Sequence, residues 1–527
     1  MASKTRIFFL NALSLTLTAL LMRAVAVIFN IYVAKSAGSE AMGLYSLLGS
    51  VYSFAITLAT AGINLGTTRL VSEALGMGNQ PLARASVRKA LLCCTVTGAI
   101  ATIILYSTSP WLSSFLLSDV RAEAPLRILS LTLTPIAVCS CLSGYFSAVR
   151  RVKVSSVSQI FVQLIRIAFT FAFLKSFGYR SAERACIALV LGTLASELSS
   201  LLITFALYLL DKRKLDNDPN ATYQDTRITA RLLKITLPVT LSACIRSLLT
   251  MIQHSLVPKG LKSSGKSWAE ALSSYGALHS MAMPLILFPS ALISGFAGLL
   301  IPEISECKIQ GNLERMARVS YRSTTLSLFF SIGVAGIITF YSNELGMLLY
   351  DNAETARYIR IMAPLIPVMY IDGTVDAILK GAGYQVYSMN VNIADTLTAC
   401  IFALTLIPRL GILGYIISIY ATEILNTALS LTKLLSISKM RPRIFHQVIM
   451  PILCIIGSTN LAGICLSLLN FAIQDGLALT ISIILTSILY AALLKITGTL
   501  GTDEKEFLFA SLMRSDRYNE KFRNAEI

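Results

Sequence analysis

The chain has 527 residues, of which 55% are hydrophobic and only 14% are charged, and its mean hydropathy is +0.68. Soluble domains carry about 25% charged residues, so this composition excludes a water-soluble fold of this size. The net charge of +17 does not indicate nucleic-acid binding, because the Lys and Arg residues lie between long apolar segments.

The apolar residues form blocks that are long enough to cross a bilayer. About 20 helical residues span the roughly 30 Å of hydrocarbon, and ranges 41–68 and 271–302 contain no Asp, Glu, Lys or Arg. We therefore expect an all-α polytopic membrane protein. Its fourteen predicted transmembrane helices lie at about residues 7–34, 43–64, 88–108, 125–149, 157–175, 185–210, 232–257, 274–301, 319–341, 358–380, 388–408, 411–433, 447–470 and 475–497.

The loops between these spans carry an uneven positive charge. With a cytoplasmic N-terminus, 30 Lys and Arg residues face the cytoplasm, 12 face the other side, and Arg23, Arg166 and Arg246 lie inside spans. Because cytoplasmic loops are enriched in Lys and Arg, this distribution predicts that both termini are cytoplasmic.

The first twelve spans contain an internal repeat. Arg23 and Arg246, Glu73 and Glu303, and Glu197 and Glu423 recur in the same order, with offsets of 223, 230 and 226 residues. Six spans is an even number, so we expect two parallel six-helix lobes related by an axis along the membrane normal. The predicted domains are an N-terminal lobe (1–210), a cytoplasmic linker (211–231), a C-terminal lobe (232–435), two further spans (436–500) and a cytoplasmic tail (501–527).

Arginines inside the spans are the first candidate site residues. A charge at the bilayer centre costs at least about 2.5–3.5 kcal/mol, so such residues face protein or a wet cavity. By the repeat, Arg23 and Arg246 occupy equivalent places, and two guanidinium groups over one cavity suit a diphosphate. The alternative is that each neutralises a buried carboxylate such as Glu197 or Glu423. Arg166 has no basic counterpart in the second lobe and fits either a cavity or a structural ion pair.

Intramembrane carboxylates form the second set of candidates. Glu197 and Glu423 are lone acidic residues near the middle of spans six and twelve, where they could couple transport to an ion or pair with the arginines. Asp372 and Asp376 share one helical face in span ten, as Asn392 and Asp395 do in span eleven. Such oxygen groups could hold Na⁺ or relay a proton.

Proline residues predict helix breaks in spans eight and ten, at Pro284, Pro289, Pro364 and Pro367. The chain contains no nucleotide-binding loop and no dinucleotide fingerprint. We therefore expect no cofactor, and transport driven by Na⁺, H⁺, the membrane potential or the substrate gradient.

Several short motifs resemble one family of membrane proteins. They are Gly38-Ser39-Glu40-Ala41-Met42-Gly43-Leu44-Tyr45, Arg69-Leu70-Val71-Ser72-Glu73, Leu287-Phe288-Pro289-Ser290-Ala291, Ile301-Pro302-Glu303-Ile304-Ser305-Glu306, Leu379-Lys380-Gly381-Ala382-Gly383 and the stretch from Ile407 to Tyr415. In this order, with fourteen spans, they are similar to the multidrug/oligosaccharidyl-lipid/polysaccharide (MOP) exporter superfamily. Within it, the chain most resembles the stage V sporulation protein B branch of bacterial flippases.

The resemblance implies a two-lobed bundle, like those of MATE transporters and MurJ-type flippases, that works by alternating access on polyprenyl-diphosphate-linked saccharides. MurJ-type lipid II flippases carry cavity arginines in their first two helices, and Arg23 matches one of them. Some also hold Na⁺ with an Asp in span seven and amide and carboxylate groups in span eleven. Asn392 and Asp395 match the latter, whereas span seven here has no Asp.

We therefore expect a monomeric, non-enzymatic flippase in a bacterial plasma membrane, active in cell-wall, spore-cortex or polysaccharide synthesis. It would move an undecaprenyl-diphosphate-linked glycan from the inner to the outer leaflet, beside cell-wall synthases and without nucleic acid. Two alternatives remain: a multidrug or cation antiporter of the same superfamily, and a non-transporting scaffold that recruits those synthases.

Overall fold

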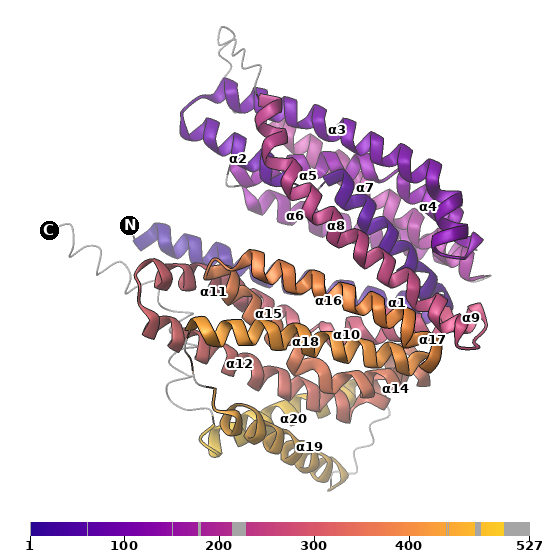
Figure 1. The fold of residues 1–527 in the computed structure, drawn as a ribbon, viewed down its shortest axis with the longest axis vertical. Coiled ribbons are helices and arrows are strands. Elements are labelled where there is room, and N and C mark those ends of the chain that lie inside the picture. The colour runs from indigo at the N-terminus through magenta and orange to yellow at the C-terminus, as the bar shows by residue number, and fades with distance from the viewer. Residues whose placement is uncertain are drawn as a thin grey trace, which may run out of the picture. The chain divides into compact units, whose positions relative to one another are not determined.

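The computed structural model describes residues 2–60, 62–149, 151–177, 181–212, 228–438, 440, 442–468 and 476–499. Side chains are described for the same residues except 2–20, 152–157, 177, 212, 299 and 466–468. Most of the expected linker (211–231) and the expected tail (501–527) therefore lie outside the described residues. The described part is helical and contains no strand (Figure 1), which confirms the all-α class.

The chain divides into two compact units. Unit 1 comprises Met1–Lys35, Ala277–Ala399 and Tyr415–Ile527, and unit 2 comprises Ser36–Gly276 and Cys400–Gly414. These bounds follow contacts between helices and differ from the lobes expected from the repeat, which stay a prediction.

Unit 2 contains the second half of α1 (Ala2–Thr60) and the helices that follow it. α1 contains both of the first two expected spans, and its one non-helical residue, Gly38 (φ 82°, ψ 168°), lies in the expected break between them. In this unit α5 packs against α2 and α3, and α6 packs against α7. The other elements of unit 2 are α2 (Ile63–Gly76), α3 (Gln80–Trp111), the π-helix η1 (Leu112–Leu116), the 3₁₀ turn η2 (Val120–Ala122), α4 (Glu123–Ser130), α5 (Leu133–Ala148), α6 (Val152–Phe177), α7 (Ala182–Lys212), α8 (Ile228–Ser263), α9 (Trp268–Tyr275) and α17 (Ile407–Leu410).

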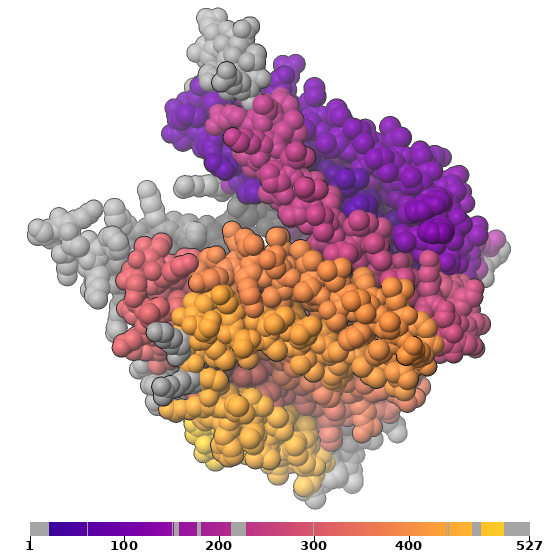
Figure 2. Space-filling model, viewed as in Figure 1, coloured from indigo at the N-terminus to yellow at the C-terminus, as the bar shows by residue number. Residues whose placement is uncertain are grey.

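Unit 1 is built around α15, which packs against α11 and α12. Figure 2 shows the face of this unit that α16, α18 and α19 form. Besides the first half of α1, its elements are the π-helix η4 (Gly276–Ala282), α10 (Met283–Leu287), α11 (Ser290–Ile309), α12 (Leu313–Phe340), α13 (Ser342–Tyr350), α14 (Ala353–Met362), the 3₁₀ turn η5 (Ala363–Leu365), α15 (Ile366–Gly381), α16 (Gln385–Thr405), α18 (Ile412–Ser438), the π-helix η6 (Phe445–Ile449), α19 (Met450–Leu468) and α20 (Gly476–Ile496).

Two of the predicted helix breaks are present in unit 1. Pro289 separates α10 from α11, and Pro364 lies in the 3₁₀ turn between α14 and α15. A proline lacks the N–H that would continue the helix ladder, so each break follows directly from the sequence.

Eleven helices of the described residues are long and apolar enough to cross a membrane, or twelve if the bent pair Val120–Ser130 and Leu133–Ala148 is one span. The count of fourteen is thus not confirmed. The first two expected spans fall in one candidate, Leu21–Gly76, and α16 is not among the candidates. The polar side chains of Asn390, Asn392 and Asp395 lower the hydropathy of α16.

The exposure pattern of α20 is the reverse of the pattern on a surface helix of a water-soluble protein, because its polar side chains are buried and its apolar side chains are exposed. Ser482 and Thr486 are fully buried, whereas Leu477 and Ile488 are 80% and 61% exposed. A bilayer solvates apolar side chains, and polar groups inside it need partners within the protein. The Thr486 hydroxyl has such a partner in Tyr341, the residue that directly follows α12, at 3.0 Å. This pattern, on a chain with eleven candidate spans, identifies a multi-pass membrane protein.

Candidate functional site

The motif that follows Gly38 is anchored in unit 2 by charge and by close packing. The Arg121 guanidinium lies 2.9 Å from a carboxylate oxygen of Glu40 and 2.8 Å from one of Asp119. The indole N–H of Trp268 donates to Asp119 at 2.8 Å. Gly43 lies against the backbone of α9, because an added Cβ would come within 2.1 Å of the Leu272 carbonyl oxygen.

Asp119 lies between two candidate spans, and its surroundings in the network shift its titration. Burial acts to raise the pKa of Asp119, but the hydrogen bonds from Arg121 and Trp268 outweigh it and lower that pKa below its usual range. The network therefore remains charged at neutral pH and holds the start of the second half of α1, at Glu40, against Arg121.

Arg166 lies within a second polar cluster of unit 2. Its guanidinium donates to the Tyr45 hydroxyl at 2.9 Å and attracts the half-buried carboxylate of Glu197 on α7. The Tyr52 hydroxyl is close enough to Arg166 and Glu197 to interact with both electrostatically, and it shares a hydrogen bond of 2.6 Å with the Thr132 hydroxyl. The structure thus brings two predicted site residues, Arg166 and Glu197, together as opposite charges.

Arg246 stands alone on α8. Its side chain is exposed and forms no hydrogen bond or ion pair with the described residues of its own unit. Arg23 belongs to unit 1, so the predicted meeting of the two arginines over one cavity stays a prediction.

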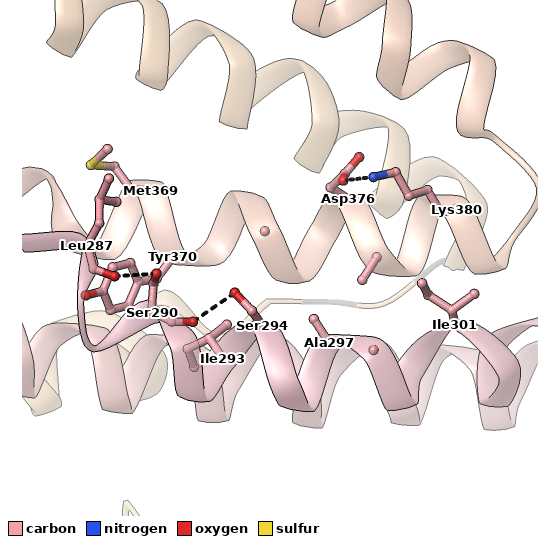
Figure 3. A pocket seen from close by; sticks show the side chains of 13 residues that line it. Leu287, Ser290, Ile293, Ser294, Ala297, Ile301, Met369, Tyr370, Asp376 and Lys380 are labelled. Atoms are coloured by element: carbon pink, nitrogen blue, oxygen red, sulfur yellow. Dashed lines mark hydrogen bonds and ion pairs between the residues drawn. The ribbon is translucent and has the colours of Figure 1, made fainter. Parts of the chain in front are cut away.

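Arg23 lies at one end of a cavity of about 350 Å³ between α11 and α15. Its guanidinium donates to the Leu287 carbonyl at 3.3 Å and to the Ser290 hydroxyl at 3.4 Å, and both residues line the cavity. Figure 3 shows Ser290, Leu287 and Tyr370 at this end. Lining residues between the two ends include Ile293, Ser294, Ala297, Gly298 and Gly373.

Asp376 and Lys380 line the other end of the same cavity (Figure 3). Their side chains form an ion pair of 2.5 Å, and Ser388 also donates to Asp376. Asp376 is therefore neutralised locally, whereas Asp372, on the same helical face, has no basic residue within ion-pair distance among the described residues.

The remaining predicted carboxylates form a second group in unit 1. Asp372 on α15, Asp395 on α16 and Glu423 on α18 are half-buried and repel one another electrostatically. One oxygen of Asp372 is buried without a hydrogen-bond partner. No three His, Cys, Asp or Glu side chains in the described part of the chain lie close enough to hold a metal ion. Asn392 donates to the Ser388 carbonyl at 2.8 Å.

Sequence reasoning did not select every residue of these sites. Ser290, Ser294 and Lys380 line the cavity but were not among the predicted site residues. Lys380 lies in the Leu379–Gly383 motif, and Ser290 directly follows the helix-breaking Pro289. Those two signals could have identified both positions.

Comparisons with known proteins place the chain in one family. The model of the polysaccharide biosynthesis protein family matches residues 8–308, and that of the MatE family matches residues 238–405. Stage V sporulation protein B of Bacillus subtilis (strain 168) is 27% identical over 446 residues, covering 83% of this chain and 86% of that protein. Lipid II flippase MurJ of the same organism is 22% identical, covering 71% and 73%.

Solved structures show the same fold. The lipid II flippase MurJ in an inward closed conformation superposes with a TM-score of 0.69 at 14% identity, covering 92% of this chain and 99% of that chain. An inward-facing MATE multidrug transporter of the MOP superfamily gives a TM-score of 0.62 at 16% identity, covering 81% and 100%. Because the matched segment 8–308 is more than half of the 527 residues, the chain belongs to the polysaccharide biosynthesis protein family.

Proposed function

We propose that this protein is a flippase for an undecaprenyl-diphosphate-linked glycan, such as a peptidoglycan precursor, which it moves from the inner to the outer leaflet by alternating access. Family membership and the similarity to a lipid II flippase and to a sporulation protein support a role in cell-wall, spore-cortex or polysaccharide synthesis. In this proposal the protein is a transporter and the glycan-lipid is its substrate.

One observation carries the proposal, namely the environment of Arg23. It lies in a candidate membrane span, yet its side chain is exposed and its described partners are neutral oxygens. Among the described residues of their own units, neither Arg23 nor Arg246 forms an ion pair with a carboxylate. A guanidinium that keeps its charge without a carboxylate partner favours an anionic ligand, and its planar fork suits a phosphate group.

The cavity beside Arg23 suits a sugar diphosphate head group. The Ser290 and Ser294 hydroxyls line it and could bond sugar hydroxyls, and the Asp376–Lys380 ion pair at the far end offers further hydrogen-bonding groups. The lipid tail would remain in the bilayer. The lobes 1–210 and 232–435 would then rock about the linker 211–231.

A proteoliposome assay with a fluorescent polyprenyl-diphosphate glycan tests this proposal. We expect the Arg23→Ala/Arg246→Ala variant to lose flipping. The Arg184→Ala/Arg357→Ala variant, which removes one exposed arginine from each unit, should keep it. Equal flipping by all proteins would remove the two arginines from the mechanism. Absence of flipping even in the wild type would contradict this substrate and favour the antiporter or the scaffold.

Two cavity glycines allow a test that does not disturb folding. Gly298 and Gly373 line the cavity, and a Cβ at either one would meet nothing within 4 Å. Gly298→Leu and Gly373→Leu should therefore fill the cavity, slow flipping and leave thermal stability intact. Gly463→Leu on α19, also with open space around its Cβ, is the matched control. Unchanged flipping in both cavity variants would exclude this cavity as the head-group site.

We further propose that Asp372, Asp395 and Glu423 couple flipping to an ion. Three carboxylates that repel one another in an apolar surrounding favour uptake of a proton or a cation. Asn392, one helical turn from Asp395, would add an amide oxygen for Na⁺ if its side chain turned over. Na⁺ would then be a transported ion, and the membrane potential would add to either driving force.

Replacement of the acidic groups distinguishes the two ions. Glu423→Gln and Asp395→Asn should abolish the stimulation of flipping by an imposed Na⁺ or proton gradient. Glu197→Gln, at the repeat-related position that faces Arg166, should leave this stimulation in place. Stimulation by Na⁺ at constant pH identifies Na⁺, and stimulation by a pH gradient without Na⁺ identifies the proton. An unaltered response of Glu423→Gln would refute the coupling role.

The proposed setting is the bacterial plasma membrane, with both termini cytoplasmic, a monomeric flippase and cell-wall synthases nearby. Reporter fusions at each terminus test the orientation, because alkaline phosphatase folds only outside the cytoplasm. Size-exclusion chromatography with light scattering measures the molar mass in detergent and so tests whether the protein is a monomer.

A further inference from the structure

A groove of about 910 Å³ lies in unit 1 between α12, α14 and α19, apart from the cavity described above. α19 packs against both α12 and α20 (Figure 1). Most of the groove wall is apolar and includes Leu328, Ile332, Ile452 and Ile456. Its volume is in the range of ligand-binding sites, which is about 300–1,000 Å³.

The length of the groove corresponds to one leaflet of a bilayer. Its lining residues on α12 run from Leu328 to Phe340. Twelve residues of helix rise about 18 Å, which is close to half of the roughly 30 Å hydrocarbon thickness. On α19, Ile452 and Ile456 are 40% and 52% exposed and face the groove. This wall therefore suits a hydrocarbon chain that lies parallel to the helices within a single leaflet.

The groove ends in polar residues of both charges. Glu344, Asn343 and Arg360 line it where α12 ends and α13 begins, together with Asn460 of α19. One carboxylate oxygen of Glu344 is buried without a hydrogen-bond partner. The Arg360 side chain is exposed and forms no ion pair or hydrogen bond with the described residues of its unit. An acceptor and a cation are thus both available at one end of an apolar channel.

We propose that this groove binds one molecule of an aminophospholipid, phosphatidylethanolamine. Its acyl chain would lie between α12 and α19, its phosphate would bind Arg360, and its ammonium group would donate to Glu344. Charge complementarity selects this head group. Phosphatidylglycerol offers Glu344 only neutral hydroxyl donors and no cation, and a choline head group carries no N–H to donate. With a cytoplasmic N-terminus, this is the outer leaflet.

Native mass spectrometry of the purified full chain tests the proposal. The protein is released from nanodiscs that contain equal amounts of phosphatidylethanolamine, phosphatidylglycerol and phosphatidylcholine. We expect one retained phosphatidylethanolamine per chain, enriched over the other two lipids. Glu344→Gln and Arg360→Gln should each lower its retention about tenfold, which corresponds to one charge-assisted hydrogen bond. Arg357→Gln, one turn away on α14 and outside the groove lining, should have no effect.

A second pair of variants tests the apolar wall. Ile456→Trp should reduce the retention of all three phospholipids, because the indole enters the groove from an exposed position. Leu453→Trp is its control, since Leu453 is 55% exposed and does not line the groove. Added phosphatidylethanolamine should raise the thermal stability of the wild type but not that of Glu344→Gln. No retained lipid, a preference for phosphatidylglycerol, or equal retention in Glu344→Gln and Arg357→Gln would overturn the proposal.

Discussion

Replacement of Gly43 by Ala tests whether the motif after Gly38 serves to pack two helices closely together. An added Cβ would lie 2.1 Å from the Leu272 carbonyl oxygen and 2.9 Å from its carbon. The carbonyl cannot easily retreat, because it accepts the backbone N–H of Gly276 at the end of α9. Relief to even a tight 3.0 Å contact requires the two backbones to separate by about 0.9 Å.

Gly49, on the same helix, provides the matched control. Nothing lies within 4 Å of a Cβ built there. Both substitutions gain the same helix propensity, about 1 kcal/mol, so their difference isolates the steric cost. Overpacking of a tight contact costs about 1–3 kcal/mol. We therefore expect Gly49→Ala to be neutral or stabilising, and Gly43→Ala to be less stable than Gly49→Ala by about 1–3 kcal/mol.

Equilibrium unfolding in mixed detergent and SDS micelles, followed by tryptophan fluorescence, measures this difference. Gly276→Ala should behave like Gly43→Ala, because its Cβ would meet the Ser39 carbonyl oxygen at 2.0 Å. The double variant should lose less than the sum of the two, since either one already forces the helices apart. If Gly43→Ala proves as stable as Gly49→Ala, the close approach of α1 and α9 is refuted.

Three further predictions concern the ion pairs and glycines that hold each unit. Because the pKa of Asp119 lies below its usual value, the stability it contributes is present at neutral pH and is lost as the pH falls below about 4. Asp119→Asn should thus lower the melting temperature at pH 7 and flatten its acid dependence, whereas an unchanged acid profile would contradict the assignment. Arg315 bonds both Glu303 and Glu306, and since all three are partly exposed, Arg315→Gln should cost only about 1 kcal/mol or less; a loss of several kcal/mol in unfolding would argue against this. Gly381→Ala should destabilise unit 1, because its Cβ would meet the Ile301 carbonyl at 2.7 Å, while Gly463→Ala should not; equal melting temperatures would show that α11 and α15 can separate without cost.

The sequence alone predicts the features that depend on one helix at a time. The apolar blocks identify the membrane helices, Pro289 and Pro364 identify the breaks in spans eight and ten, and Gly38 lies where the first two spans separate. Each of these follows from hydropathy or from local backbone chemistry. Hydropathy alone does not fix the number of spans. α16 is a helix at the position of the eleventh expected span, but its polar side chains keep it out of the candidate spans.

Groupings between helices are harder to predict, because they depend on how each helix is rotated about its axis. Asp372 and Asp376 share a face of α15, yet Asp376 pairs with Lys380 at the cavity, whereas Asp372 is repelled electrostatically by Asp395 and acts in the same way on Glu423. A difference of one helical turn therefore separates a neutralised carboxylate from a member of the acidic group. No periodicity in the sequence distinguishes these two positions.

The repeat predicts equivalent positions but not equivalent chemistry, and Glu197 and Glu423 illustrate the difference. Glu197 lies in the field of Arg166, which the second half of the chain does not repeat. Glu423 instead lies in the repulsive field of two further carboxylates, for which the first half has no counterparts. A compensated charge can stay ionised and hold helices together, whereas an uncompensated acidic group must take up a proton or a cation. The repeat predicted from the sequence thus relates the positions of the two intramembrane glutamates but not their surroundings. In the proposed function, a basic partner that is present beside Glu197 and absent beside Glu423 is what would confine ion coupling to unit 1.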